Sequence, residues 1–352
     1  MIDIGGRQVG PDAPPFVIAE VSGNHGGSLD RAMEIVESVA AAGAHALKLQ
    51  TYTADSMTFD VDHPRFRISD PTSLWTGRHL HELYREAATP WEWHEPIFTR
   101  ARELGLVVFS SPFDRAAVEL LDGLDAACMK IASFEIVDLP LIRAAAETGR
   151  PLIISTGMAT REEIEEAVAT ARTAGCDQLA VLQCTSSYPA PAAASNLRTI
   201  PDLRAWTGAE VGLSDHTLGI GVAVAAVALG ATLIEKHVTL SRSDGAVDSS
   251  FSLEPQELAA LVVETRRAWE SLGTVAYGPN AADERSLAHR RSLFFDRDLP
   301  AGRTLVDGDF RSVRPSDGLS PRHADELLGR TLARDVRRGE PVGWDDLATE
   351  PS

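Results

Sequence analysis

Positive charge is the first thing that this sequence has little of. Its 352 residues contain 33 Lys and Arg against 51 Asp and Glu, which gives a formal net charge of −18. Such an excess of negative charge argues against a surface that binds nucleic acid or an anionic membrane. An anionic ligand would therefore have to be met by a few locally placed Lys and Arg side chains.

Cysteine and long apolar runs are also scarce. The three cysteines are an odd number without the spacing of a disulfide framework, which suits a reducing cytoplasm. No basic segment followed by an apolar one opens the chain, so we expect no signal peptide. The longest uncharged run, 216–234, contains several glycines and is weakly hydrophobic for a membrane span. We therefore expect a cytoplasmic protein with neither a membrane nor a nucleic acid as partner.

The apolar runs that are present alternate with helical patterns eight times. An apolar fraction of 44% and a charged fraction of 24% are typical of a soluble globular protein. The near-continuous Val, Ile and Leu content of the runs indicates parallel strands buried on both faces, and eight such units predict an α/β fold, a (β/α)8 TIM barrel over residues 1–273. The eight predicted strands are 16–20, 46–50, 107–110, 128–131, 152–155, 179–183, 212–217 and 234–237.

Two further segments depart from the alternation. The insertion 51–89 is long for a loop in a compact domain and carries Trp75 and Tyr84, so we expect an ordered lid. After the eighth predicted helix, 255–272, Gly278-Pro279-Asn280 breaks the pattern, and we place a linker at 274–285. Residues 286–352 combine short strand-like pieces, turns and many charges, which predicts a small, mostly β domain.

Polar residues stand at the carboxyl end of every predicted barrel strand, where barrel enzymes build their sites. Any one of them has an ordinary explanation: a strand-end Lys can reach water, a Ser can cap the next helix, and a lone His is more often a loop residue than a ligand. Eight coincident polar ends favour a site instead. They are Glu20; Lys48 and Gln50; Ser111; Lys130 and Ser133; Ser155; Ser186 and Tyr188; Ser214 and His216; and His237.

These residue types indicate a particular chemistry. Two lysines among serine hydroxyls suit a ligand that carries phosphate and carboxylate. The imidazoles of His216 and His237 suit a divalent transition metal that polarises a carbonyl, with Asp215 as a candidate to orient a metal-bound imidazole. Glu20 could be a general base or an acceptor for a polyol, and Asp248 adds a carboxylate over the mouth. The residues thus predict a metal-dependent enzyme acting on a small phosphorylated anion and an oxygen-rich partner.

Six motifs resemble those of the sialic acid synthase family, and the tail resembles the antifreeze-like (SAF) domain of those enzymes. The motifs are Ile18 to His25, Leu47 to Tyr52, Lys130 to Ser133, Ser155 to Met158, Gly212 to Thr217 and Glu235 to His237. The resemblance implies condensation of phosphoenolpyruvate with an open-chain acetamido sugar aldehyde. The products would be a nine-carbon 2-keto acid and phosphate, formed by C–O cleavage. It also implies Mn2+ as the usual metal, with Mg2+ or Co2+ as alternatives.

Within the family, the chain is most similar to the pseudaminic acid branch. The motifs that carry this similarity are Ala44 to Thr53, Ser73 to Trp75, Thr89 to His94 and Leu218 to Ala223. That branch implies a 2,4-diacetamido-2,4,6-trideoxy-altrose substrate. It also implies a homodimer whose SAF domains are swapped, so that Arg314 reaches the partner's active site.

The resemblance also assigns a role to each matched residue. His216 and His237 would hold the metal, with Glu20 as the group that handles protons. Gln50, Tyr188, Asp248 and Arg314 would meet the sugar. Phosphoenolpyruvate would be held by Lys48, Ser111, Lys130, Ser133, Ser155, Ser186 and Ser214.

Two of these residues depart from the family pattern. Ser186 stands where the sialic branch usually has Asn, and Ser111 where Thr is commoner. Both keep a hydroxyl, although Ser186 lacks the amide, so its contact is the least secure of the set.

Three rival functions remain open from the sequence. A synthase using N-acetylmannosamine or the legionaminic acid precursor would share nearly every barrel residue. A metal aldolase acting on pyruvate is disfavoured by the Lys and Ser ring, and phosphate release would decide. A sugar-binding or ice-binding protein built on the tail would not need a barrel with a full ring of polar strand ends.

Overall fold

The computed structural model describes residues 1–71 and 73–349, which form two compact units, one up to Gly273 and one from Thr274 on. The first unit is a closed barrel of eight parallel strands in the order β10-β3-β4-β5-β6-β7-β8-β9. The predicted TIM barrel is therefore confirmed. The strands are β3 (Phe16–Glu20), β4 (Ala46–Thr51), β5 (Val107–Pro112), β6 (Met129–Ile131), β7 (Leu152–Ser155), β8 (Leu179–Cys184), β9 (Glu210–Asp215) and β10 (Leu233–His237).

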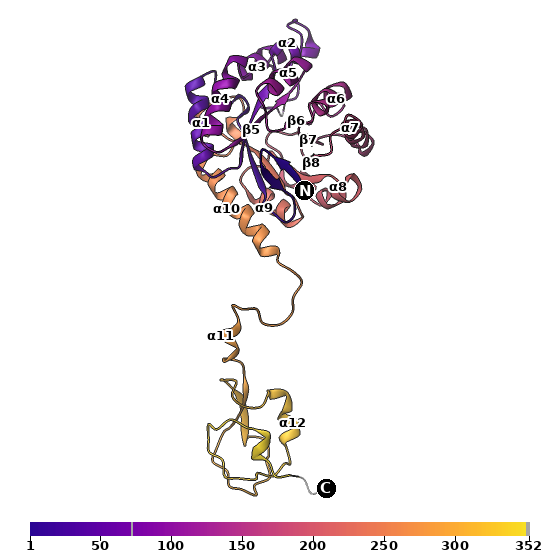
Figure 1. Cartoon of the computed structure of the whole chain (residues 1–352). Helices are drawn as coiled ribbons and strands as arrows, with labels where there is room; N and C mark the ends of the chain where they lie inside the picture. The colour runs from indigo at the N-terminus through magenta and orange to yellow at the C-terminus, as the bar shows by residue number, and fades with distance from the viewer. Residues whose placement is uncertain (72, 350–352) are drawn as a thin grey trace. The chain divides into compact units, whose positions relative to one another are not determined.

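Helices follow each strand and surround the barrel (Figure 1). Their apolar faces pack on strands that are buried along almost their whole length, as expected for a parallel sheet covered on its outer side. Helix α7 shows why the helices begin where they do, since Thr160 and Glu163 form a reciprocal capping box at its start. The covering helices are α1 (Leu29–Ala41), α4 (Trp91–Glu103), α5 (Arg115–Gly123), α6 (Leu139–Glu147), α7 (Arg161–Thr173), α8 (Thr199–Thr207), α9 (Gly221–Ala228) and α10 (Pro255–Leu272).

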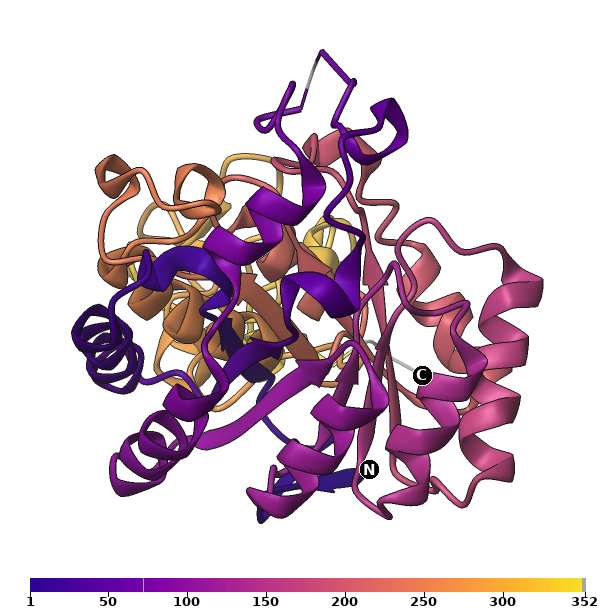
Figure 2. The ribbon, with the colours of Figure 1, turned by 90° about the horizontal axis from the view of Figure 1, so that it is seen from above.

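Two additions mark the two ends of the barrel. A hairpin of β1 (Ile2–Ile4) and β2 (Arg7–Val9) precedes the first barrel strand. The insertion between β4 and α4 contains α2 (Ala54–Met57) and α3 (Leu80–Ala87), and it stands at the opposite end from the hairpin (Figure 2). The indole of Trp75 in this insertion donates a hydrogen bond to the carbonyl of Val247, at 3.2 Å. The insertion therefore contacts the loop that follows β10, and its role as an ordered lid stays a prediction; residue 72 lies outside the described residues.

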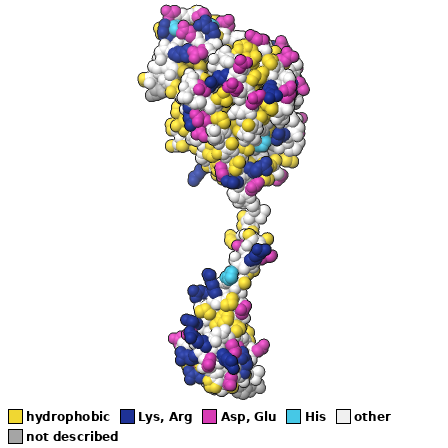
Figure 3. Space-filling view, turned by 90° about the vertical axis from the view of Figure 1, so that its left-hand side faces the viewer, with side chains coloured by type: hydrophobic (Ala, Val, Ile, Leu, Met, Phe, Trp, Pro, Cys, Tyr) yellow, Lys and Arg dark blue, Asp and Glu magenta, His cyan; other side chains and the backbone are white. Residues whose placement is uncertain are grey.

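The second unit has its own small core. Strands β11 (Ser292–Phe295) and β12 (Phe310–Val313) pair antiparallel, and the short helices α11 (Glu284–Leu287) and α12 (Ala324–Leu327) accompany them. Its buried side chains include Leu293, Phe295, Leu305, Leu327 and Val342. Arginine side chains are plentiful on the face of this unit seen in Figure 3. The predicted mostly β domain is confirmed, and the assignment of 274–285 as a linker stays a prediction.

No helix in the described part of the chain combines the length and apolarity needed to cross a bilayer.

Candidate active site

The carboxyl ends of the barrel strands bring most of the predicted residues together in a buried site. Because successive strand residues face opposite sides, Glu235 and His237 of β10 point into the barrel while Lys236 between them points out. Ten of the predicted residues are buried: Glu20, Lys48, Ser111, Lys130, Ser133, Ser155, Ser214, His216, His237 and Asp248. Gln50, Ser186 and Tyr188 are half-buried, and Arg314 is exposed in the second unit.

A buried network of charges forms the floor of this site. The Lys48 ammonium contacts the Glu20 carboxylate and lies 3.1 Å from Glu235 Oε1. The Lys130 ammonium lies 3.7 Å from the same Glu235 oxygen and donates to Ser155 Oγ at 2.7 Å. Two ammonium groups thus face two carboxylates in a volume closed to solvent, where Coulomb interactions are strong.

The two carboxylates of this network differ in acidity. Burial, opposed by Lys48 and reinforced by the charge of Glu235, raises the pKa of Glu20 to about 7. Burial acts in the same direction on Glu235, but the ammonium groups of Lys130 and Lys48 outweigh it and lower the pKa to about 2. Glu235 is therefore a permanent anion between the lysines, whereas Glu20 can take up or release a proton near neutral pH.

Serine hydroxyls surround the two lysines, as predicted. Lys48 Nζ donates to Ser111 Oγ at 3.4 Å, and Ser214 Oγ donates to Glu235 Oε1 at 3.2 Å. The hydroxyls of Ser133 and Ser186 are 2.7 Å apart. An anion placed over the lysines would therefore meet both positive charge and several directional donors.

The site contains two carboxylates that the sequence reasoning did not single out. Glu235 stands two residues before His237 on the same strand, so both side chains lie on the same face. The alternation that places Lys48 and Gln50 on one face therefore also predicts Glu235 in the site. Glu135 follows β6 in a loop, and burial raises its pKa to about 7. No local pattern marks Glu135, since it stands in the loop between β6 and α6, where no strand or helix period applies.

The two histidines lie side by side. Their ring centroids are 5.3 Å apart, and the Tyr188 ring packs 4.4 Å from that of His216. Nδ1 of His216 donates to the carbonyl of Thr185 at 2.9 Å, which leaves Nε2 free to accept or ligate. Nδ1 of His237 is buried without a hydrogen-bond partner in the described part of the chain, and Asp248 Oδ2 is 3.8 Å away.

This donor set fits a divalent metal held by two imidazoles. Burial lowers the pKa of His237, which keeps its imidazole in the neutral form that ligates metals. Among residues 1–71 and 73–349, no group of three or more His, Cys, Asp and Glu side chains has a metal-binding arrangement. Water or substrate oxygens would have to complete the coordination.

The predicted role of Asp215 is wrong. The strand alternation that points Ser214 inward turns Asp215 outward, where its carboxylate pairs with Lys236 at 2.9 Å. A backbone carbonyl, that of Thr185, orients the His216 ring instead.

All three lysines of the chain, Lys48, Lys130 and Lys236, are buried in the barrel. The other basic side chains are arginines, which carry the positive charge of the surface.

Family comparison agrees with this geometry. Residues 35–277 match the model of the NeuB family, and residues 290–348 match that of the SAF domain. The chain belongs to the NeuB family. The predicted resemblance to this family of synthases, including its SAF domain, is thereby confirmed.

Named relatives span nearly the whole chain. The pseudaminic acid synthase of Campylobacter jejuni is 41% identical over 96% of this chain and 97% of its own length. That of Helicobacter pylori is 38% identical over 95% of this chain and 98% of its own length. The N,N'-diacetyllegionaminic acid synthase of Campylobacter jejuni is 32% identical over 93% of this chain and 98% of its own length.

A solved relative has the same architecture. The N-acetylneuraminic acid synthetase from Leptospira borgpetersenii, crystallised with citrate, superposes with a TM-score of 0.72. It is 32% identical, and the match covers 81% of this chain and 94% of that one.

Proposed function

We propose that this NeuB-family chain condenses phosphoenolpyruvate with 2,4-diacetamido-2,4,6-trideoxy-β-L-altropyranose to give pseudaminic acid and phosphate. The observation that carries the proposal is the buried pair Lys48 and Lys130 with its ring of hydroxyls, beside two adjacent imidazoles. The higher identity to pseudaminic acid synthases than to the legionaminic relative supports the choice of sugar.

Phosphoenolpyruvate is assigned to the floor of the site. Lys48 and Lys130 supply the positive charge that its phosphate and carboxylate require, and the serines supply oriented donors. The residues proposed to hold it are Lys48, Ser111, Lys130, Ser133, Ser155, Ser186 and Ser214. The sugar is assigned to Gln50, Tyr188 and Asp248 nearer the mouth, with Arg314 completing the site.

We assign His216 and His237 to a divalent metal, most simply Mn2+, with Mg2+ or Co2+ as alternatives. When bound there, the ion would act as a Lewis acid toward the sugar aldehyde. His216 is held for this role by its bond to the Thr185 carbonyl, and Tyr188 shields its ring from water.

The remaining chemistry falls to the chain's own side chains. The C2–C3 double bond of phosphoenolpyruvate supplies the electron pair for a new bond from C3 to the aldehyde carbon, and the aldehyde oxygen takes up a proton to become a hydroxyl. Water adds to C2, and the bond from C2 to the phosphate oxygen then breaks, which leaves a ketone at C2 and releases phosphate. With a pKa near 7, Glu20 can accept the proton that water loses as it adds. Lys48 and Lys130 hold the phosphate oxygens and stabilise the charge that they take on leaving.

The three-lysine composition gives a direct test of substrate binding. Lysine carrying 13C at Cε would give three NMR signals, which single Lys→Arg variants assign. Phosphoenolpyruvate should shift the signals of Lys48 and Lys130 and leave that of Lys236 in place. Equal shifts at all three, or none, would refute the assigned floor.

The sugar is tested by turnover. Phosphate release should be fastest with the diacetamido-altrose, compared with N-acetylmannosamine and the legionaminic precursor. Faster phosphate release with either competing sugar would instead indicate a neuraminate or legionaminic acid synthase. The 32% identity to the legionaminic acid synthase supports that alternative. Turnover of pyruvate without phosphate release would favour a metal aldolase.

We also propose a homodimer in which Arg314 of one subunit serves the barrel of the other. Support comes from apolar side chains exposed in loops at the carboxyl ends of the strands, which a second subunit would cover: Phe134 (57% exposed), Val137 (59%), Met158 (58%) and Leu218 (64%). Mixing inactive Arg314→Ala and Lys130→Ala subunits should restore activity, because one site of the hybrid is intact. Hybrid dimers without activity would place Arg314 in its own subunit's site.

A cytoplasmic location is proposed from the cysteines. Cys128, Cys176 and Cys184 are all free and buried, so the described chain has thiols suited to a reducing compartment.

A further inference from the structure

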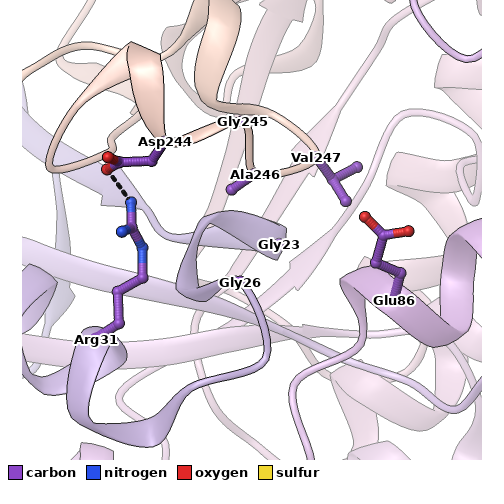
Figure 4. Close-up of a pocket in the computed structure, with 8 residues that line it drawn as sticks. All are labelled: Gly23, Gly26, Arg31, Glu86, Asp244, Gly245, Ala246 and Val247. Carbon is purple, nitrogen blue, oxygen red and sulfur yellow. Dashed lines mark hydrogen bonds and ion pairs between the residues drawn. The ribbon is translucent and has the colours of Figure 1, made fainter.

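The loop between β10 and α10, residues 238–254, carries Asp248. Its outer part, residues 244–247, lines a cavity and is called the rim below. A cavity of about 260 Å³ separates this rim from the 3-10 turn Ser22–His25 and from α1 and α3 (Figure 4). One ion pair, Arg31 with Asp244, crosses the cavity edge, and both side chains are about a quarter exposed. The indole of Trp75 also donates to the carbonyl of Val247 at this rim, at 3.2 Å. Polar contacts therefore contribute to holding this part of the loop.

Asn24 supplies the inner anchor of the same loop. It is fully buried, and its Nδ2 donates to the carbonyl of Val238 and to Ser252 Oγ, each at 2.8 Å. Because a backbone carbonyl only accepts, the contact with Val238 fixes which end of the amide carries the hydrogens. One side chain thus joins the first turn after β3 to both ends of the loop.

The hydrogen bonds continue from Asn24 to Asp248. Ser252 Oγ donates to the backbone carbonyl of Asp248 at 2.7 Å. The hydroxyl of Ser22, two residues before Asn24, donates to the carboxylate of Asp248. The backbone and the side chain of Asp248 are therefore both held from one short turn, beside His237.

We propose that Asn24 is the positioning residue that sets Asp248 for the sugar, an inference that rests on the proposed function of the site. Asn24 does not touch substrate; it acts by holding the loop through Val238 and Ser252. Its buried Oδ1 has no hydrogen-bond partner in the described part of the chain, so the amide is retained for its two donated bonds.

The test is Asn24→Asp, which keeps the shape of the side chain and removes the donors. The new carboxylate would face the Val238 carbonyl, so the loop should loosen and the KM for sugar should rise by roughly tenfold or more, as expected for a displacement of about 1 Å. The KM for phosphoenolpyruvate should stay within about twofold, because Lys48 and Lys130 lie on other strands. Lowering the pH should reduce the defect, since a protonated carboxyl can donate one of the lost bonds.

Asp244→Asn is the matched control, because it cuts the rim ion pair on the same loop and leaves both bonds donated by Asn24 Nδ2 in place. The Nε of Arg31 can still donate to the backbone carbonyl of Asn24, as it does at 2.9 Å in the structure. Asp244→Asn should change the sugar KM by less than about threefold, since exposed pairs contribute little. Ser252→Ala is the milder second variant should Asn24→Asp fold poorly, and it should raise the sugar KM in the same selective way. Equal effects of Asn24→Asp and Asp244→Asn, or a parallel loss for both substrates, would overturn the inference.

Amide hydrogen exchange separates failure of this inference from failure of the proposed function. Exchange in residues 246–252 should rise in Asn24→Asp and Ser252→Ala and stay at the wild-type level in Asp244→Asn. If the wild-type chain releases no phosphate with any of the three sugars, the proposed function is wrong. Unchanged exchange in Asn24→Asp would refute the role of Asn24 whatever the substrate.

Discussion

Replacing Lys236 by Met should destabilise the barrel severely while leaving the inner face of the site chemically intact. The Lys236 ammonium is 1% exposed and makes three contacts, to Asp215 Oδ2 at 2.9 Å, the Thr217 carbonyl at 2.6 Å and the Gly219 carbonyl at 2.9 Å. Together these contacts close the turn that follows His216. The substitution leaves the buried Asp215 carboxylate without its partner, and breaking such a pair costs about 3–5 kcal/mol.

That loss is a large part of the stability of an ordinary domain, which is about 5–15 kcal/mol. For a domain of roughly this size, each kcal/mol lowers the melting temperature by about 2–4 °C, so a decrease of about 6–20 °C is expected. Circular dichroism of the full chain, followed with temperature and with urea, measures both quantities. Arg115→Met is a suitable control, because this exposed cation on α5 of the same unit lies 3.3 Å from the likewise exposed carboxylate of Glu119.

The double variant Lys236→Met/Asp215→Leu decides whether the pair acts as a unit. Without an uncompensated charge, it should recover part of the loss of Lys236→Met, because apolar replacements of buried pairs are often nearly neutral. Additive losses, or a Lys236→Met variant within 1 kcal/mol of wild type, would show that the ion pair does not hold the His216 turn.

Three further outcomes follow from the site. Glu20→Gln should lower kcat by about 10²–10⁴ with little change in the KM for phosphoenolpyruvate, and near-normal turnover in a phosphate-release assay would remove Glu20 from proton transfer. His216→Ala or His237→Ala should abolish calorimetrically measured Mn2+ binding, whereas full wild-type activity after chelation would contradict a metal-dependent reaction. Burial raises the pKa of Glu135 from 4.5 to about 7, so between these pH values the folded chain binds a proton that the unfolded chain does not. The protonated Glu135 therefore contributes stability at low pH, and this contribution is lost as the pH rises from about 4.5 to 7. Glu135→Gln should remove about 3 kcal/mol of the pH-dependent change in the free energy of unfolding between about pH 4.5 and 7, measured by urea titration, and an unchanged pH dependence would argue against the raised pKa.

The barrel could be predicted because its strands are short apolar runs bounded by polar residues. Six of the eight predicted strands agree with the observed ones to within one residue at each end, and β5 starts as predicted but runs two residues further, to Pro112. The seventh run is displaced at both ends, since it was predicted at 212–217 and is observed as β9 at Glu210–Asp215. The chain leaves the sheet before His216 because Lys236 binds the carbonyls of Thr217 and Gly219, a contact between strands that no local pattern encodes.

The site residues could be predicted from the sequence where their chemistry depends only on the residue type and on a position at a strand end. Lysines and serines at strand ends indicate an anion site wherever the strands meet, and the structure brings Lys48, Ser111, Lys130 and Ser155 within hydrogen-bond reach of one another or of Glu235. Glu235 was not singled out because its function depends on lying between two lysines from different strands. Its pKa of about 2 is a property of that arrangement, since burial by itself would raise it.

Strands β9 and β10 show how closely site chemistry is tied to register. Glu235 pairs with Ser214 on the inner face, and Lys236 pairs with Asp215 on the outer face, so each face carries one complementary pair. A slip of one residue in β10 would turn Lys236 inward toward Lys48 and Lys130, and Glu235 and His237 outward. The outer ion pair therefore favours the only register that places a carboxylate between the two inner lysines and an imidazole beside His216.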